Sequence, residues 1–239
     1  MIPKTIHYCW FGKGEMPELA LRCIDSWHKH MPDYEYKLWN EDAFDVNSVS
    51  YTKEAYEAKK YAFVSDYVRL WALERDGGIY LDTDVEVFRT LEDLLEYKAF
   101  AGIEGSKYFP LGTCVMATEA HGEWVSEMLG AYQDRHFLKN DGSHDMTTNV
   151  QFITDIMQGR GFLNNGKEQD YKDLHIFPVE FFCPRQTTGE YFRTENTYCD
   201  HLGMGSWTGN SDGMKSRIKT IVGQKSMIRL IKLKRKLFG

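Results

Sequence analysis

The sequence predicts an α/β fold with a mainly parallel central sheet. Two observations lead to this prediction. Short apolar runs typical of strands alternate along the chain with longer segments of helical spacing, as in βαβ units. The chain has 239 residues, of which 42% are hydrophobic, which is enough for one sizeable domain with its own core. We expect this domain to span residues 1–210.

The first half of the chain begins with a strand and ends with a helix stop. Residues 2–10 predict the first strand, which a turn at residues 11–14 closes. Residues 17–30 have helical spacing, and residues 34–39 predict a second strand. Residues 53–75 predict a long helix that ends at Gly77 and Gly78, because glycine accepts the positive φ of a helix C-cap.

The second half opens with a strand of alternating polarity over residues 79–87. Helical segments follow at residues 122–132 and 149–158, and a further strand is expected at residues 174–177. The chain then loops towards residues 203–207. These elements complete the alternation that favours the α/β class.

An acidic pair, Asp82 and Asp84, lies within this alternating segment. At positions i and i+2 of a strand, both carboxylates are expected on one face of the sheet. Carboxylate oxygens are preferred ligands of Mg²⁺ and Mn²⁺, and the phosphates of a bound diphosphate can complete the shell. A D-x-D pattern alone is a weak signal, because acidic pairs on strand edges are usually solvated.

A second polar pair, Asp66 and Arg69, precedes the acidic pair in the sequence. Their i,i+3 spacing places both side chains on one face of the predicted helix. Two interpretations follow from the spacing. The pair is either a surface ion pair or a polar clamp for a ribose, a base edge or a sugar hydroxyl.

Three ordered blocks of sequence resemble glycosyltransferase family 32. They are IPKTIHYCWFG at residues 2–12, FVSDYVRL with GGIYLDTD at residues 63–84, and NTYCDHLGMGSW at residues 196–207. This family contains bacterial capsule and lipopolysaccharide transferases and fungal mannosyltransferases, and is related to the large clostridial glucosylating toxins. The resemblance implies a GT-A type nucleotide-sugar-binding fold and a metal-dependent, retaining transferase.

The resemblance also implies a donor site. Trp10 is expected to stack on the nucleotide base, which makes a UDP-sugar the expected donor. Further donor contacts are expected from Ser65, Asp66, Arg69, Tyr80 and Asn149. For Asn149 a helix N-cap is an equally good interpretation.

The resemblance implies different roles for Asp82 and Asp84. Asp82 would hold the ribose and donor sugar as well as approach the metal, and Asp84 would bind Mn²⁺ or Mg²⁺ directly. The metal would neutralise the departing diphosphate as a Lewis acid.

Near the C-terminal end of the resemblance, His201 and Ser206 are the candidates for a further metal ligand. Many members of the family carry two adjacent histidines here, whereas this chain has His201 followed by Leu202. Trp207 is expected to close over the donor and exclude water.

Residues 211–239 form a separate basic tail. Nine basic residues and no acidic one lie between Met214 and Gly239, interleaved with apolar residues. Such a stretch suits an anionic membrane surface; a solubilising tail is the alternative. Because the whole chain carries −6, the residues before Met214 carry −15, which argues against nucleic acid as a partner.

The cysteines and the hydropathy pattern indicate where the protein works. Five widely spaced cysteines with no C-x-x-C pair argue against a disulfide framework and a zinc knuckle, and fit a reducing cytosol. The sequence has no apparent signal peptide and no apolar run of about 18 residues. We expect a cytoplasmic protein that associates peripherally with the inner face of the plasma membrane.

Three functions are compatible with these patterns. The first is transfer of a sugar to a glycan or lipid-linked acceptor in polysaccharide biosynthesis, such as capsule formation. The second is a toxin-like transferase that glycosylates a protein. The third is a non-catalytic sugar-nucleotide binding module.

Overall fold

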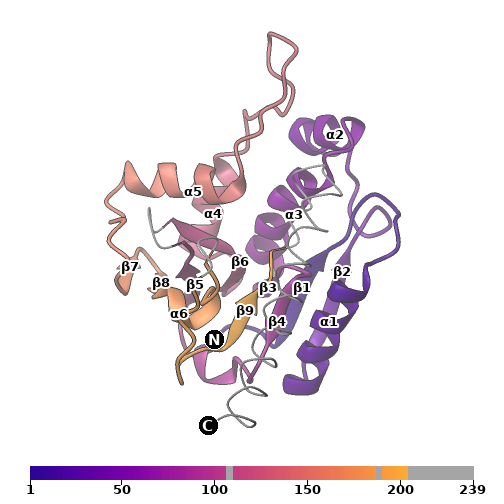
Figure 1. Ribbon diagram of the computed structural model, residues 1–239. Helices are drawn as coiled ribbons and strands as arrows, with labels where there is room; N and C mark the ends of the chain where they lie inside the picture. The colour runs from indigo at the N-terminus through magenta and orange to yellow at the C-terminus, as the bar shows by residue number, and fades with distance from the viewer. Residues whose placement is uncertain (106–109, 187–189, 204–239) are drawn as a thin grey trace, which may run out of the picture. The chain divides into compact units, whose positions relative to one another are not determined.

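The computed structural model describes residues 1–105, 110–186 and 190–203 (Figure 1). The chain divides into a unit of Met1–Leu202 and a second of Gly203–Gly239. The predicted domain limit at residue 210 and the basic tail, residues 211–239, lie outside the described residues. All helices and strands of the described residues belong to the first unit.

A seven-stranded sheet forms the centre of this unit. Its strands are β1 (Thr5–Cys9), β2 (Glu35–Trp39), β3 (Gly78–Leu81), β5 (Ala99–Ile103), β6 (Leu111–Thr118), β7 (Gln169–Tyr171) and β8 (Leu174–Phe177). The spatial order is β2-β1-β3-β6-β5-β8-β7. β6 and β7 run against the other five strands of this sheet. The predicted α/β fold with a mainly parallel sheet is therefore confirmed.

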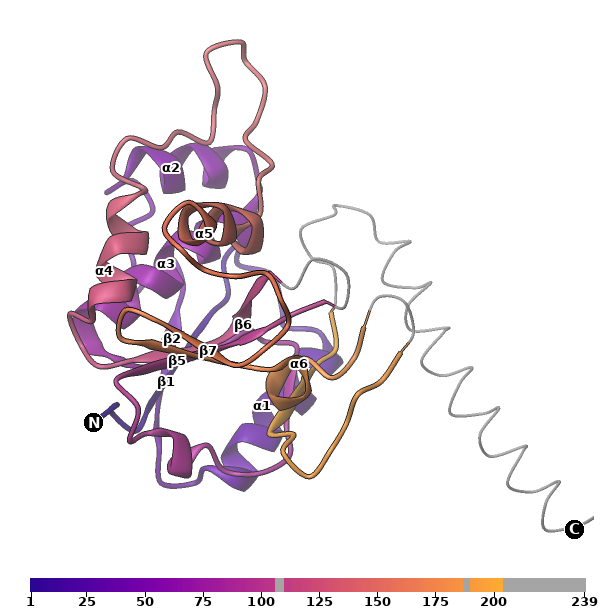
Figure 2. The ribbon, with the colours of Figure 1, turned by 90° about the vertical axis from the view of Figure 1, so that its left-hand side faces the viewer.

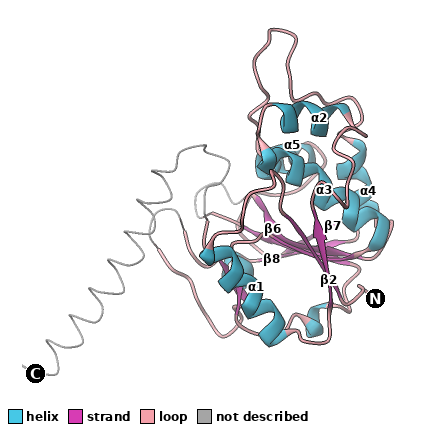
Figure 3. Ribbon diagram, turned by 90° about the vertical axis from the view of Figure 1, so that its right-hand side faces the viewer, coloured by secondary structure: helices cyan, strands magenta, loops and turns pink. Residues whose placement is uncertain are grey.

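Helices cover both faces of the sheet. They are α1 (Glu18–His30), α2 (Ser50–Glu57), α3 (Tyr61–Asp76), α4 (Glu123–Gly130), α5 (Asn149–Gln158), α6 (Val179–Phe182) and a 3₁₀ turn, η1 (Glu92–Leu94). Helices α2 to α5 lie on one face, and α1 and α6 lie on the other (Figures 2 and 3). None of the described helices is long and apolar enough to span a membrane.

The two faces of the sheet have separate apolar cores. On one face, Leu70 of α3 and Trp124 of α4 belong to a cluster that includes Met116 of β6. On the other, Trp27 of α1 packs in a cluster with Ile6 and Ile79. Because successive residues of a strand point to opposite faces, the central strands contribute to both cores, and β3 is buried throughout.

The helix predicted over residues 53–75 is two helices in the structure. α2 ends at Glu57 and α3 begins at Tyr61, and Lys59 between them has a φ of 56°. The N–H of Lys60 donates to the carbonyl of Ala55, so the break is a capped helix end. The sequence pattern misses this break because no glycine or proline marks it.

The strand predicted over residues 79–87 is also interrupted. β3 ends at Leu81, and the N–H of Val85 donates to the carbonyl of Asp82 at 3.0 Å, which closes a turn. β4 (Val85–Val87) then leaves the central sheet and pairs with β9 (Cys199–His201). The expectation that Asp82 and Asp84 share the face of one strand is therefore wrong, since both lie in the turn.

The predicted stop of the preceding helix is confirmed. Gly77 caps α3 with a φ of 64°, and Gly78 begins β3 with a φ of 105°. A Cβ at Gly77 would lie 2.6 Å from the backbone nitrogen of Ala120, so the position also requires the missing side chain. This tight connection places the end of α3 directly before the strand that leads to Asp82.

Candidate functional site

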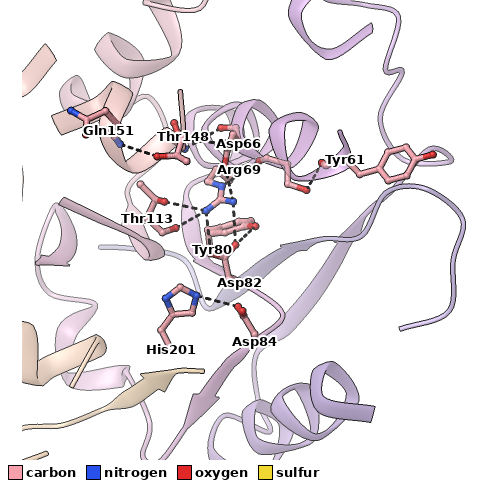
Figure 4. Close-up of polar contacts among 12 residues, drawn as sticks. Tyr61, Asp66, Arg69, Tyr80, Asp82, Asp84, Thr113, Thr148, Gln151 and His201 are labelled. Carbon is pink, nitrogen blue, oxygen red and sulfur yellow. Dashed lines mark hydrogen bonds and ion pairs between the residues drawn. The ribbon is translucent and has the colours of Figure 1, made fainter. Parts of the chain in front are cut away.

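The carboxyl ends of β1 and β3 define the location of the candidate site. The two strands are parallel neighbours, so Trp10, which follows β1, and Asp82, which follows β3, lie at the same edge of the sheet. In open α/β sheets, ligands bind outside the carboxyl ends of the strands. The sequence-predicted residues of α3 border this edge (Figure 4).

A buried arginine on α3 connects the two acidic motifs. The guanidinium of Arg69 lies 3.0 Å from Asp66 and 3.1 Å from Asp82, and donates to the Thr113 carbonyl at 2.8 Å (Figure 4). Arg69 is only 5% exposed. The pair Asp66–Arg69 is therefore no surface ion pair, and its predicted contact with a donor stays a prediction.

All three guanidinium nitrogens of Arg69 have protein partners. Nε donates to the Ser65 carbonyl, Nη1 to Thr113, and Nη2 contacts both carboxylates. Burial alone would lower the pKa of Arg69, but Asp82 and the other anionic partners outweigh it and raise this pKa. Arg69 therefore stays charged and fixes the direction of the Asp82 side chain.

Asp82 has a second partner in Tyr80. The Tyr80 hydroxyl donates to Asp82 Oδ1 at 2.9 Å, and the Arg69 guanidinium lies 4.6 Å from the centre of the Tyr80 ring. Burial raises the pKa of Tyr80 well above its usual value. The hydroxyl therefore keeps its proton and remains a donor to Asp82.

Asn149, expected to touch the donor or cap a helix, contacts Asp66 in the structure, and its contact with a donor stays a prediction. Its side-chain amide donates to the Asp66 carbonyl at 3.2 Å and accepts from the Tyr132 hydroxyl at 3.0 Å, and its backbone N–H donates to the Asp66 carboxylate. The N-cap interpretation is wrong, because the cap is Thr148, whose hydroxyl accepts from the Gln151 N–H. Asn149 thus anchors the start of α5 to α3.

The carboxyl group of Asp66 has a perturbed pKa. Burial raises its pKa to about 6, Arg69 opposes the shift, and the nearby Asp82 adds to it. The protein therefore holds two carboxyl groups around a single guanidinium.

Asp84 and His201 meet on the other side of the turn. β4 and β9 are antiparallel, and Val85 pairs with His201, so the imidazole Nε2 lies 3.3 Å from Asp84 Oδ1 (Figure 4). Burial disfavours the imidazolium, but the Asp84 carboxylate outweighs this and raises the pKa of His201 well above 6.5. A cation bound here would displace that proton.

The three side chains Asp82, Asp84 and His201 fit a divalent cation. Each offers one ligand atom, and these atoms lie within 4.8 Å of one another. Two carboxylate oxygens and an imidazole nitrogen suit Mn²⁺, and two carboxylates with donor phosphates suit Mg²⁺. Although the predicted strand geometry was wrong, the predicted proximity of the two carboxylates is correct.

Trp10 and Ser65 lie in the outer part of this edge. Trp10 is partly exposed, and its indole N–H donates to the Gly14 carbonyl at 2.6 Å. Ser65 lies one turn before Arg69 and donates back to the Tyr61 carbonyl at 3.3 Å. Both remain predicted donor contacts. Ser206 and Trp207 lie outside the described residues.

Sequence reasoning missed several residues beside the acidic pair. The Thr113 carbonyl accepts a hydrogen bond from Arg69. A second group of candidate metal ligands consists of His201 with Glu104, Cys114 and Cys183. These residues come from distant segments, so no local spacing in the sequence reveals them. Only the pairing of β5, β6 and β8 brings them together.

Comparison with known families gives one match to a protein-family model. Residues 17–101 match the glycosyltransferase sugar-binding region containing DXD motif. The matched segment includes Asp66, Arg69, Tyr80 and both carboxylates of the D-x-D. It does not include Trp10 or His201.

Two characterised relatives match over similar lengths. Inositol phosphoceramide mannosyltransferase 3 of Schizosaccharomyces pombe is 38% identical over an alignment of 103 residues that covers 41% of this chain and 29% of the relative. Subversion of eukaryotic traffic protein A of Legionella pneumophila is 29% identical over an alignment of 111 residues that covers 35% of this chain and 17% of the relative. The matched segments thus span less than a third of either relative.

Among solved structures, a protein described as PaToxG Glycosyltransferase resembles this chain. It has 20% sequence identity and a TM-score of 0.48, with 66% of this chain and 70% of that chain covered. The fold assignment rests on the strand pairings of this chain itself.

Proposed function

We propose that this protein is a metal-dependent, retaining glycosyltransferase of GT-A type, related to family 32. It would move a sugar from a nucleotide-sugar donor to a hydroxyl acceptor. The convergence of Asp82, Asp84 and His201 beside the Arg69 clamp is the observation that supports this proposal most strongly. The match of residues 17–101 to a sugar-binding DXD family adds support.

In this proposal Asp84 and His201 would hold Mn²⁺ or Mg²⁺, with Asp82 alongside. A bound cation of this kind supplies Lewis-acid neutralisation of a departing diphosphate. Asp82 has its carboxylate fixed by Arg69 and Tyr80, so it can orient donor hydroxyls without losing side-chain entropy on binding. Arg69 acts through Asp82 rather than by direct contact, since each of its nitrogens already has a protein partner.

The donor base is proposed to stack on Trp10, with uracil as the first candidate. The partly exposed indole at the carboxyl end of β1 is compatible with this role. The name of the Schizosaccharomyces pombe relative adds mannose as a candidate sugar, for which a GDP-sugar is the matching donor class. Both donor classes therefore belong in the test.

The acceptor is proposed to be a glycan or a lipid-linked oligosaccharide. The name of the Schizosaccharomyces pombe relative supports a lipid acceptor more directly than a capsular one. We further propose that the basic residues between Met214 and Gly239 hold the enzyme on an anionic membrane surface at the inner face of the plasma membrane, with the enzyme in the cytoplasm.

A transferase that glycosylates a protein is the second candidate. The relative from Legionella pneumophila, whose name refers to subversion of eukaryotic traffic, is the observation that favours it. The two candidates share the donor site and differ only in acceptor.

Slow donor hydrolysis by the full chain tests the shared proposal. UDP- and GDP-sugars would be incubated with the protein and Mn²⁺, and release of free sugar would be measured by chromatography. Metal-dependent release from one donor supports the proposal and names the sugar. Binding of a sugar nucleotide with no turnover, and no transfer to glycan, lipid or protein acceptors, would support the non-catalytic binding module instead.

A further inference from the structure

A second group of ligand atoms lies next to the D-x-D. It consists of Glu104, Cys114, Cys183 and His201, whose ligand atoms all lie within 4.8 Å of one another. The two sulfur atoms are 3.2 Å apart. Such a group needs two thiols from distant parts of the chain to meet an imidazole and a carboxylate.

Three separate elements and one adjoining segment position these four side chains. Cys114 lies in β6, Cys183 is the C-cap of α6, His201 ends β9, and Glu104 directly follows β5. The backbone at Cys183 is fixed by its N–H, which donates to Val179, and by its carbonyl, which accepts from Gln186. The group is thus held by the fold rather than by one flexible loop.

The donor set differs in chemical character from the D-x-D. Two thiolates, one imidazole and one carboxylate favour Zn²⁺ and similar thiophilic cations, whereas carboxylates with phosphate favour Mg²⁺ or Mn²⁺. Zinc sites have Zn–S distances of about 2.3 Å and Zn–N distances of about 2.0 Å, so tetrahedral ligands lie roughly 3.3–3.8 Å apart. The ligand atoms that lie farthest apart would have to approach each other by at most about 1.5 Å, and the two sulfur atoms, 3.2 Å apart, would have to separate by about 0.6 Å, to reach that range.

The group is closed on the sulfur side and accessible on the other. Cys114 and Cys183 are buried, while Glu104 and His201 are partly exposed. A cation could therefore enter from the side of the D-x-D. Burial raises the pKa of Glu104, and the nearby His201 opposes that shift.

We propose that Glu104, Cys114, Cys183 and His201 form a binding site for a thiophilic divalent cation of the Zn²⁺ class. This site is distinct from the hard-cation site at Asp82 and Asp84, but it shares His201 with it. Both sites use the single imidazole of His201, so occupation of the sulfur site competes with the hard-cation site for this side chain.

The two sites are also joined through the backbone. The N–H of Asp82 donates to the carbonyl of Cys114 at 2.9 Å, and the N–H of Leu202 donates to the carbonyl of Asp84 at 2.9 Å. A cation that draws Cys114 and His201 together would therefore move the segments that flank the D-x-D. We therefore expect the thiophilic cation to inhibit donor turnover. This inhibition rests on the proposed function, whereas the binding of the cation does not.

Cobalt(II) titration of the full-length reduced protein tests the binding without any turnover assay. Thiolate coordination to Co²⁺ gives a charge-transfer band in the near ultraviolet, and tetrahedral coordination gives intense visible bands. The expected result is both sets of bands, saturating at equimolar Co²⁺ and reversed by Zn²⁺. Cys114→Ser and Cys183→Ser should each lose most of the charge-transfer band and weaken Co²⁺ binding by more than about tenfold, the loss typical of even an outer-shell change.

Matched controls separate this site from its neighbours. Cys23→Ser removes another buried thiol that lies outside the group and should leave the cobalt spectrum unchanged. Asp84→Asn should also keep the charge-transfer band, since Asp84 is not in the sulfur group. Far-ultraviolet circular dichroism would confirm that each variant is folded.

Three outcomes would overturn the proposal. These are the absence of a charge-transfer band in the reduced wild type, a band equally strong in Cys114→Ser and Cys183→Ser, or a band lost in Asp84→Asn. Loss of free thiols without added metal would show that the cysteine pair serves as an oxidisable dithiol instead. If the cobalt bands appear but Mn²⁺-dependent donor hydrolysis does not, the proposed function fails while the metal site stands.

Discussion

Replacement of Arg69 by methionine should destabilise the fold strongly. Methionine keeps much of the side-chain volume but removes the charge that lies between Asp66 and Asp82. Arg69 is 5% exposed and pairs with these carboxylates at 3.0 and 3.1 Å. The variant therefore leaves two carboxylates facing each other without the cation that compensates them.

The magnitude follows from the burial of the pair. Removing one partner of a buried ion pair costs about 3–5 kcal/mol, because the other partner stays desolvated. The Thr113 carbonyl loses a donor as well, although this acceptor adds less. With an m-value of about 2–3 kcal/mol/M, the urea midpoint should fall by roughly 1–2 M.

Urea unfolding at pH 8, followed by circular dichroism, is the assay. The double variant Asp66→Asn/Arg69→Met should recover about 1 kcal/mol or more, because it removes one of the two repelling charges. Arg75→Met is the control, since the Arg75 side chain is 44% exposed and its ion pair with Asp76 should contribute about 1 kcal/mol or less. An Arg69→Met variant with the same urea midpoint as the Arg75→Met control would show that the ion pairs of Arg69 with Asp66 and Asp82 do not stabilise the fold.

Three further predictions concern the acidic network, the base and the tail. Burial raises the pKa of Asp66 to about 6, so the folded state binds an extra proton between about pH 4 and pH 6, and this contribution to stability is lost as the pH rises through that window. The stability of the wild type relative to Asp66→Asn should therefore fall by about 3 kcal/mol between about pH 4 and pH 7, and a constant difference in urea unfolding would contradict the shift. Trp10→Ala should weaken UDP binding in calorimetry by roughly 5- to 150-fold, the range expected for a lost stacking contact, whereas unchanged affinity would exclude stacking on Trp10. Deletion of residues 214–239 should abolish binding to anionic liposomes while donor hydrolysis persists; joint loss of both would make the segment part of the fold.

The sequence predicted many of the regular elements, but it missed the strands β5, β6, β7 and β9 and the interruptions of two predicted elements. α1, α4, α5 and β8 lie close to their predicted limits because their apolar spacing reflects burial against the sheet. The break before α3 and the turn at Asp82 were not predicted. Both depend on hydrogen bonds that the local spacing of residue types does not encode. At the break before α3, the Lys60 N–H donates to the Ala55 carbonyl, and at the turn the Asp82 N–H donates to the carbonyl of Cys114.

In the candidate site too, contacts between residues close in sequence were predicted, whereas contacts between distant segments were not. The i,i+3 spacing of Asp66 and Arg69 predicted their contact, and the closeness of Asp82 and Asp84 followed from their separation in sequence. Their surroundings could not be predicted, because Asn149 and the sulfur group reach the site only through long-range packing. His201 was found through a family resemblance, and its contact with Asp84 depends on the pairing of β4 with β9.

Mn²⁺ dependence of donor hydrolysis in Asp84→Asn tests the central claim most directly. The variant loses a buried carboxylate that faces His201 at 3.3 Å, while Glu86→Gln in the same strand region is the control. We expect the Mn²⁺-dependent rate to fall by about 100-fold, equivalent to roughly 2.7 kcal/mol of barrier, with the control near wild type. A variant that keeps the wild-type rate and the wild-type Mn²⁺ titration curve would contradict the assignment of Asp84 to a metal site.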